Sequence, residues 1–247
     1  MNAVIQSERM TGLRTVFLDA GGVLVFPNWD RISAGLREHG VNVDPAALAT
    51  AEPHAKWKLD RTPTIRATND EQRGWRYFEL ILEHARVPLT SATAAALNEL
   101  HRYHQEFNLW DYMPADVLPS LRALRALDLQ LVIVSNANGT IAKLAERIGL
   151  TECVGCVLDS QVEKVEKPDP RFFEIAMQRS GADPDTTIHV GDLYHVDVVG
   201  ARAAGITPVL LDAASLYPEA DCVRVRSLPQ LVELVSNGAF RKNYLSG

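Results

Sequence analysis

TVFLDAGGVL, residues 15–24, contains an apolar run that a polar residue follows directly, an arrangement that recurs along this chain. Its first four residues, Thr15 to Leu18, form a short apolar run of the kind that is typical of a buried strand. Asp19 follows at once, and the Gly21-Gly22 pair after it does not match the dinucleotide fingerprint, so a bound dinucleotide is not expected. In an open parallel sheet, ligands bind at the carboxyl ends of the strands. The residues that follow each such run are therefore the candidates for a functional site.

Five further runs of the same kind predict the remaining strands, at Leu131–Val134, Cys156–Leu158, Thr187–Val190, Thr207–Leu211 and Cys222–Val225. Segments with helical periodicity lie between most of them, at Leu118–Leu127, Ile141–Leu150 and Arg171–Ser180. The last of these follows an Asp169 cap with Pro170 behind it, and it stops at Gly181. Strands and helices in alternation predict an α/β fold whose parallel sheet is covered on both faces.

The stretch between the first and second predicted strands breaks this alternation. It shows no convincing strand, and instead it predicts four helices, at residues 30–39, 45–59, 70–85 and 91–109. A crossover between parallel strands needs only about a dozen residues. We therefore expect an inserted helical domain over residues 27–114, joined by linkers at 25–28 and 111–116, and a core formed by residues 1–26 and 115–247. The insertion accounts for a length of 247 residues, which lies between one domain of about 150 residues and two.

The composition is that of an ordinary globular protein, with 47% hydrophobic and 23% charged residues, so the chain can bury a sizeable core. Asp and Glu number 31 against 25 Lys and Arg, and the net charge of −6 argues against nucleic acid as a partner. Three cysteines are too few for a disulfide framework, and no apolar run predicts a signal peptide or a membrane span. We expect a cytoplasmic monomer or homodimer with no membrane or nucleic acid partner.

Polar residues follow four of the predicted strands. They are Asp19 after the first, Ser135-Asn136 after the second, Lys164 and Lys167-Pro168-Asp169-Pro170 in the loop after the third, and Gly191-Asp192 with Asp197 after the fourth. Each residue by itself suits an ordinary turn or helix cap, but parallel strands bring all of them to one edge of the sheet. Carboxylates at that density repel each other unless a cation lies among them, and oxygen-only ligands suit Mg²⁺.

With these residues in this order, the sequence resembles the haloacid dehalogenase superfamily of hydrolases. Four stretches carry the resemblance over nearly the whole chain: Phe17 to Leu24, Val134-Ser135-Asn136, Lys167 to Pro170, and Val190-Gly191-Asp192 with Asp197. The helical insertion after the first stretch is similar to the cap of family members that carry it at that position. The resemblance thus implies a Rossmann-like core with an inserted helical cap.

The resemblance also implies the chemistry of the site. Asp19 would be the nucleophile that takes a phosphoryl group from a small phosphorylated metabolite, and Ser135 and Lys167 would be further catalytic residues. The substrate would be bound by Gly22, Ser135, Asn136 and Lys167, and Mg²⁺ by Asp19, the Gly21 carbonyl, Asp192 and Asp197. Lys167 is preferred to Lys164 because the family's lysine precedes a proline, as Lys167 does.

One position departs from the family's phosphatases. They carry a second Asp two residues after the nucleophile, which protonates the leaving group and then activates water, and this chain has Gly21 there. General acid–base catalysis of that kind contributes about 10²–10⁴-fold. We therefore expect Asp19 to be phosphorylated by a substrate with a good leaving group and the phosphoenzyme to hydrolyse slowly.

The departure leaves alternatives open. In phosphonatases of the family a cap lysine forms a Schiff base. Lys56 and Lys58 lie in a predicted cap helix at a sequence separation from Asp19 comparable to that of this lysine, although helix lysines are usually solvated. Dehalogenases of the family displace halide, but they work without a metal and lack the Gly191-Asp192 form of the fourth stretch. A third alternative is a non-catalytic module that binds a phosphorylated ligand or a partner.

Three other groups of residues complete the sequence-based expectations. Cys153 and Cys156 have the spacing of a metal or redox pair, but no second pair lies nearby, so buried thiols are expected. His101 and His104 suit a solvated or packing face of a cap helix better than a ligand pair. The candidates to face the substrate from the cap are Trp57, Arg66, Trp75, Arg76 and Tyr77.

Overall fold

A computed structural model describes residues 12–62 and 70–240. The strands are β1 (Thr15–Leu18), β2 (Gln130–Ser135), β3 (Cys156–Asp159), β4 (Thr187–Gly191), β5 (Thr207–Leu211) and β6 (Val223–Val225). The helices of the inserted segment are α1 (Trp29–Glu38), α2 (Pro45–Arg61), α4 (Asp70–His84) and α5 (Ser91–Phe107). The helices among and after the strands are α6 (Val117–Ala126), α7 (Ile141–Arg147), α8 (Ser160–Glu163), α9 (Pro170–Ser180), α10 (Val199–Ala203) and α11 (Leu228–Ser236), with a π-helical turn at Tyr194–Val198 before α10.

The six strands form one sheet in the order β3-β2-β1-β4-β5-β6, and every neighbouring pair is parallel. β1 lies between β2 and β4, with Leu18 opposite Ile133 on one side and opposite Val190 on the other. This register brings the carboxyl ends of three strands together. The predicted parallel α/β sheet is confirmed, and each strand begins and ends within one residue of its predicted bounds.

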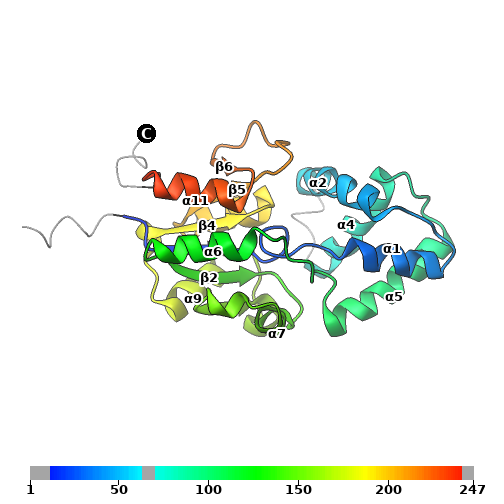
Figure 1. Cartoon of the computed structure of the whole chain (residues 1–247), viewed down its shortest axis with the longest axis horizontal. Helices are drawn as coiled ribbons and strands as arrows, with labels where there is room; N and C mark the ends of the chain where they lie inside the picture. Colours follow the sequence, from blue (N-terminus) through cyan, green and yellow to red (C-terminus); the bar gives the residue numbers. More distant parts are fainter. Residues whose placement is uncertain (1–11, 63–69, 241–247) are drawn as a thin grey trace, which may run out of the picture.

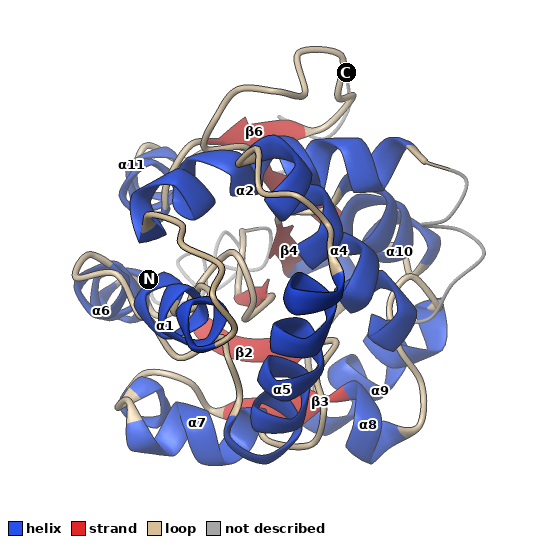
Figure 2. Cartoon of the chain, turned by 90° about the vertical axis from the view of Figure 1, so that its right-hand side faces the viewer, coloured by secondary structure: helices blue, strands red, loops and turns tan. Residues whose placement is uncertain are grey.

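Both faces of the sheet are buried, as the continuous apolar strands predict. Val16 and Leu18 of β1 pack on one face in a cluster with residues of α6, α7 and α11, whereas Phe17 packs on the other face with Phe172 and Phe173 of α9. The alternation follows from the two-residue period of a strand. Helices surround the sheet in Figure 1, and Figure 2 shows α6, α7 and α11 on one side of the strands and α9 on the other.

The inserted helices form a separate lobe beside the carboxyl ends of the strands (Figures 1 and 2). They share a hydrophobic cluster of their own, in which Leu36 of α1, Leu48 of α2, Leu80 of α4 and Leu97 of α5 are buried. Separate clusters are what two packed units require. The division of the chain at residues 27 and 114 stays a prediction.

The two chain segments that lead into and out of this lobe run side by side. Phe26 and Tyr112 exchange backbone hydrogen bonds of 2.7 and 3.2 Å in an antiparallel bridge. The Asn28 side chain also donates to the carboxylate of Asp111 over 2.9 Å. Both predicted linkers therefore meet at one place, where the lobe is joined to the sheet.

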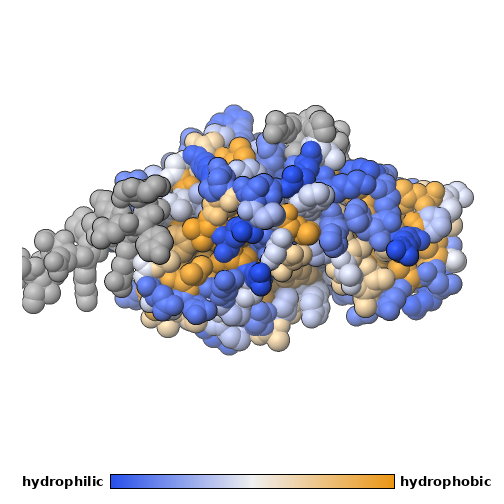
Figure 3. All heavy atoms as spheres, turned by 90° about the horizontal axis from the view of Figure 1, so that it is seen from above, coloured by the Kyte–Doolittle hydropathy of each residue, from blue (hydrophilic) through white to orange (hydrophobic). Residues whose placement is uncertain are grey.

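Several elements were not predicted from the sequence. α8 and α10 are too short to show a period, and α11 was missed although Ser227 caps it and a proline follows the cap. The helix expected at 141–150 ends at Arg147, because Gly149 turns the chain with φ near 80°. Within the described ranges no helix has the length and apolarity to cross a membrane. Figure 3 shows apolar residues only as patches among polar ones.

Candidate active site

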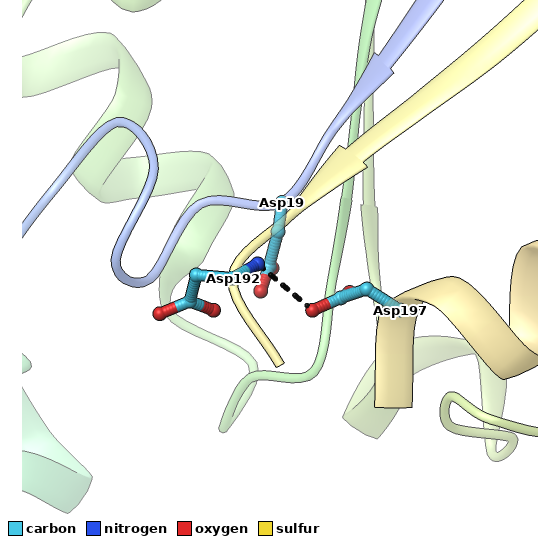
Figure 4. A group of neighbouring side chains, drawn as sticks. All are labelled: Asp19, Asp192 and Asp197. Atoms are coloured by element: carbon cyan, nitrogen blue, oxygen red, sulfur yellow. Dashed lines mark hydrogen bonds between the residues drawn. The ribbon is translucent and has the colours of Figure 1, made fainter. Parts of the chain in front are cut away.

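Three carboxylates meet at the carboxyl ends of β1 and β4 (Figure 4). Asp19 follows β1, Asp192 follows β4, and Asp197 lies in the π-helical turn after it. One oxygen of each lies within 4.8 Å of the others. The expected convergence of these three residues is therefore present in the structure.

Asp197 is the most firmly held of the three. Its Oδ1 accepts from Lys167 Nζ at 2.8 Å and lies 3.0 Å from His189 Nε2. Its Oδ2 accepts from the backbone amides of Asp192 at 3.1 Å and Leu193 at 3.0 Å. Each of its two oxygens therefore has two partners. Asp197 is thus fixed in orientation and in turn orients the lysine.

Lys167 is fully buried, and its ammonium bridges Asp197 and Asp19 at 2.8 and 3.0 Å. The backbone of Lys167 is held by Asn136, whose Oδ1 accepts from Lys167 N at 2.8 Å and whose Nδ2 donates to Lys167 O at 3.0 Å. Ser135, at the end of β2, is buried next to Asn136 and lines a cavity that also reaches Asp19 and Asp192. The side chain of Lys164, by contrast, is exposed, as expected for the second candidate lysine.

Burial dominates the electrostatics of the site. It raises the pKa of Asp19 to about 7 and that of Asp192 to about 6, against the opposing effects of Lys167 and Lys56. Burial alone would also raise the pKa of Asp197, but Lys167 and His189 outweigh it and hold this pKa below its ordinary value. Two of the three carboxyl groups thus hold protons more tightly than usual, although two ammonium groups lie among them.

Two glycines make this crowding possible. A Cβ at Gly191 would overlap the carboxylate of Asp197, and a Cβ at Gly22 would overlap that of Asp192. Gly22 also has φ of +76°, which disfavours other residues. Its amide donates to Val25 O at 2.8 Å, so a substrate-binding role for Gly22 would have to use another part of the residue. Both glycines are needed for the carboxylates to approach the backbone.

Lys56 of α2 reaches the site from the inserted lobe, which the sequence did not favour. Its Nζ lies 2.6 Å from Asp192 Oδ2 and 2.6 Å from Glu52 Oε1, and its side chain is 15% exposed. Lys58 points away, is 45% exposed and pairs with Glu83. Burial lowers the pKa of Lys56, but Asp192 and Glu52 outweigh it and raise this pKa above its ordinary value. An ammonium held this way opposes Schiff-base formation, which needs a neutral amine.

A cavity of about 740 Å³ extends from the carboxylates into the inserted lobe. Of the predicted substrate-facing residues, Trp75 and Tyr77 line it. Trp57 does not line it, and the guanidinium of Arg61 lies over its ring at 4.5 Å. Arg76 does not line it either and pairs with Glu79 and Glu83. Arg66 lies outside the described residues.

Four other rings line the cavity wall. Phe78 and Trp110 were not considered from the sequence. His101 and His104 were expected on a solvated or packing face, and they do pack, against Trp75 and Trp110, while also lining the cavity. Outside the cavity wall, Cys153 and Cys156, which were expected to be buried thiols, are free thiols, the first buried and the second partly buried. Periodicity could place Phe78 on the inner face of α4, but nothing in the sequence indicates that Trp110, which follows α5, turns into the cavity.

The donor set fits a divalent cation. Asp19, Asp192 and Asp197 offer only oxygen atoms, which Mg²⁺ prefers. These three carboxyl groups and Glu52 share two ammonium groups, those of Lys56 and Lys167. A further positive charge at this position would therefore be stabilised.

The chain matches known proteins over most of its length. A family model described as haloacid dehalogenase-like hydrolase matches residues 13–205. Haloacid dehalogenase-like hydrolase domain-containing protein 3 of Bos taurus is 28% identical over 179 residues, which is 71% of each protein. Ribulose-1,5-bisphosphate 5-phosphatase of Halopiger xanaduensis is 30% identical over 181 residues, which is 71% of this chain and 72% of the relative.

A solved structure agrees with these sequence matches in its fold. The magnesium-bound HAD-hydrolase YfnB of Bacillus subtilis has a TM-score of 0.67 at 16% identity, covering 91% of this chain and 99% of its own. The likeness at this identity concerns the fold, which is the α/β sheet with inserted helices described above. The family match spans the first carboxylate, the buried lysine and the carboxylates after β4. This chain belongs to the haloacid dehalogenase-like hydrolases.

Proposed function

We propose that this hydrolase is a magnesium-dependent phosphatase of small phosphorylated metabolites that works through an aspartyl-phosphate at Asp19. One observation carries the proposal: three carboxylates lie within 4.8 Å of one another, next to a buried lysine, and two of them, Asp19 and Asp192, line a cavity. The relatives named ribulose-1,5-bisphosphate 5-phosphatase and glyceraldehyde 3-phosphate phosphatase support the choice of a phosphorylated substrate.

The nucleophile would be Oδ2 of Asp19. Oδ1 already accepts from the amide of Ala20 at 2.7 Å and lies 3.0 Å from Lys167 Nζ, so Oδ2 is the oxygen left to attack phosphorus. A bond forms between Oδ2 and phosphorus while the ester P–O bond breaks, and its electron pair leaves on the alcohol oxygen, which takes a proton from water. Asp19, the Gly21 carbonyl, Asp192 and Asp197 would hold Mg²⁺, which reduces the repulsion between carboxylate and phosphate.

The remaining residues would hold the phosphoryl group. Lys167 brings a fixed positive charge whose position is set by Asp197 and by the backbone contacts of Asn136. Ser135 and the amide that follows it would donate to phosphoryl oxygens. Preorganised donors of this kind stabilise charge that develops in the transition state without rearranging.

Gly21 would slow the second half-reaction, which is the hydrolysis of the aspartyl-phosphate. A water oxygen attacks phosphorus, the bond between phosphorus and Asp19 breaks, and inorganic phosphate and the free carboxylate result, with the proton of the water passing to solvent. No carboxylate at position 21 assists this proton transfer. We therefore expect the phosphoenzyme to accumulate.

Rapid-quench trapping tests the proposal. With a phosphate ester that has a good leaving group, the wild type and Mg²⁺ should give an acid-stable, hydroxylamine-labile phosphoenzyme, and Asp19→Asn or EDTA should abolish it. Asp169→Asn is the matched control, because Asp169 is a helix cap in the same region and Asn caps helices equally well. If the wild type binds the ester but yields neither phosphoenzyme nor phosphate, the proposal fails and a non-catalytic binding module is favoured.

A further inference from the structure

The inner wall of the inserted lobe is aromatic where it faces the carboxylates. Six rings line the cavity there: Trp75, Tyr77, Phe78, His101, His104 and Trp110. All but Tyr77 are only partly buried, so their rings keep exposed surface toward the cavity. Apolar and aromatic walls with a few polar groups are what a site uses to hold an apolar ligand.

The rings support one another from different elements. Trp75 of α4 lies against His101 of α5, with ring centres 4.7 Å apart. Trp110 contacts Tyr77, Phe78 and His104 at 5.8, 5.6 and 5.1 Å. Edge and face contacts at these distances are favourable for aromatic pairs. The wall is therefore prearranged rather than assembled around a ligand.

One ring of this aromatic wall, Trp110, lies next to the loop that follows the nucleophile Asp19. The position that a Cβ of Gly21 would take lies 3.6 Å from both Cδ1 and Nε1 of Trp110. Gly21 follows Asp19 by two residues, so the indole of Trp110 lies next to the position where family phosphatases have a carboxylate.

The lack of a carboxylate at position 21 also favours an aromatic leaving group. Without an acid there, the ester oxygen departs as an anion, with the electron pair of the broken P–O bond, and is protonated by water afterwards. A phenolic oxygen has a pKa of about 10 and an aliphatic alkoxide one near that of water, about 15.7. An aryl ester therefore tolerates the missing acid, whereas an alkyl ester does not.

The cations that line the cavity bear on the rest of the substrate. Lys56 and Arg73, from the inserted helices, are both ion-paired: Lys56 with Glu52 and Asp192, and Arg73 with Glu166 at 3.0 Å. Lys164, after α8, lines the cavity as well. An uncharged aromatic group can bind without displacing any of the paired carboxylates.

We propose, building on the phosphatase function above, that the substrate is an aryl phosphate monoester whose ring binds against the wall formed by Trp75, His101 and Trp110. The cavity volume of about 740 Å³ lies well within the range of sites that enclose a ring-bearing ligand, roughly 300–1,000 Å³.

Binding of two phosphonates tests recognition apart from turnover. Phenylphosphonate and cyclohexylphosphonate carry the same anion and similar volume, and neither has an ester bond to break. Calorimetry in the presence of Mg²⁺ should show phenylphosphonate binding about two- to tenfold more tightly. Trp75→Leu should remove most of this preference, while Phe107→Leu, an exposed ring outside the cavity, should leave it unchanged. Equal affinities for the two phosphonates in the wild type would overturn the proposal.

Turnover separates this inference from the proposed function. Phenyl phosphate should exceed cyclohexyl phosphate in kcat/KM by more than 100-fold, and Trp75→Leu should act mainly on KM. If both esters are hydrolysed at similar rates, the phosphatase function stands and the aryl preference fails. If neither ester is hydrolysed but phenylphosphonate still binds more tightly, the aromatic site stands and the phosphatase function fails.

Discussion

At the residue scale, Gly21 offers the most direct test of how complete the site is. Its φ lies outside the left-handed region, and an added Cβ would meet only Trp110, at an ordinary contact distance of 3.6 Å. Gly21→Asp should therefore fold and restore the missing acid. We expect kcat for an alkyl phosphate to rise by about 10²-fold, with much less gain for an aryl phosphate. Steady-state phosphate release measures both.

Gly21→Ala provides the matched control, since it adds the Cβ without the carboxyl group and should therefore show no gain on the alkyl ester. A Gly21→Asp enzyme that folds but gains nothing on the alkyl ester would mean that the site supports a different chemistry. The same substitution at Gly22 is not an equivalent control, because a Cβ there overlaps the carboxylate of Asp192.

Single residues also differ in how far the sequence could place them. Asp19, Asp192 and Lys167 follow or lie near strand ends, and parallel pairing brings strand ends together whatever the rest of the chain does. Lys56 was ambiguous because its position depends on how α2 lies against the sheet. That orientation rests on contacts between distant residues, such as the ion pair between Lys56 and Asp192, which no local pattern encodes.

At the element scale, the last turn of α2 is joined to the π-helical turn after β4. The carboxylate of Asp60 accepts from the backbone amides of Tyr194 at 2.9 Å and His195 at 2.8 Å. Asp197 lies in the same turn, so this contact couples the inserted lobe to the segment that orients Lys167. Amides at the start of a helical turn lack partners within it, which is why a carboxylate is favourable there.

Asp60→Ala should lower the free energy of unfolding by about 3 kcal/mol or more, because two hydrogen bonds to a charged group are lost. Urea denaturation measures this loss, and hydrogen exchange should show faster exchange at the amides of Tyr194 and His195. Asp116→Ala is the control, since Asp116 precedes α6 without capping it and should cost little. Unchanged exchange at the two amides in Asp60→Ala would contradict the proposed coupling.

As with the single residues, some helices and strands could be predicted from the sequence and others could not. Short buried strands between polar turns were predicted to within one residue, and the four inserted helices to within two. α8, α10 and the π-helical turn were not, because segments of four or five residues carry no recognisable period and form only where backbone groups find partners such as Asp60.

At the scale of the whole molecule, two lobes enclose one charged site, so the state of that site affects the stability of the fold. Burial raises the pKa of Asp19 to about 7 and of Asp192 to about 6, from 3.8. Between about pH 4 and pH 7 the folded protein therefore holds protons that the unfolded chain has released. Stability of the metal-free protein is favoured at the low end of this window and decreases as the pH rises through it. Asp197, with its lowered pKa, stays ionised throughout the window.

Mg²⁺ should reverse this trend, because it binds the ionised carboxylates and competes with their protons. At about 100 times its Kd a ligand contributes about 2.7 kcal/mol, or roughly 5 °C or more in Tm for a chain of this size. We expect a rise of that order at pH 8 and less than about 2 °C at pH 5, measured by calorimetry against EDTA. Asp19→Asn should lose most of the increment at pH 8, whereas Asp169→Asn should keep it. An equal increment at both pH values would mean that Mg²⁺ does not bind through Asp19 and Asp192.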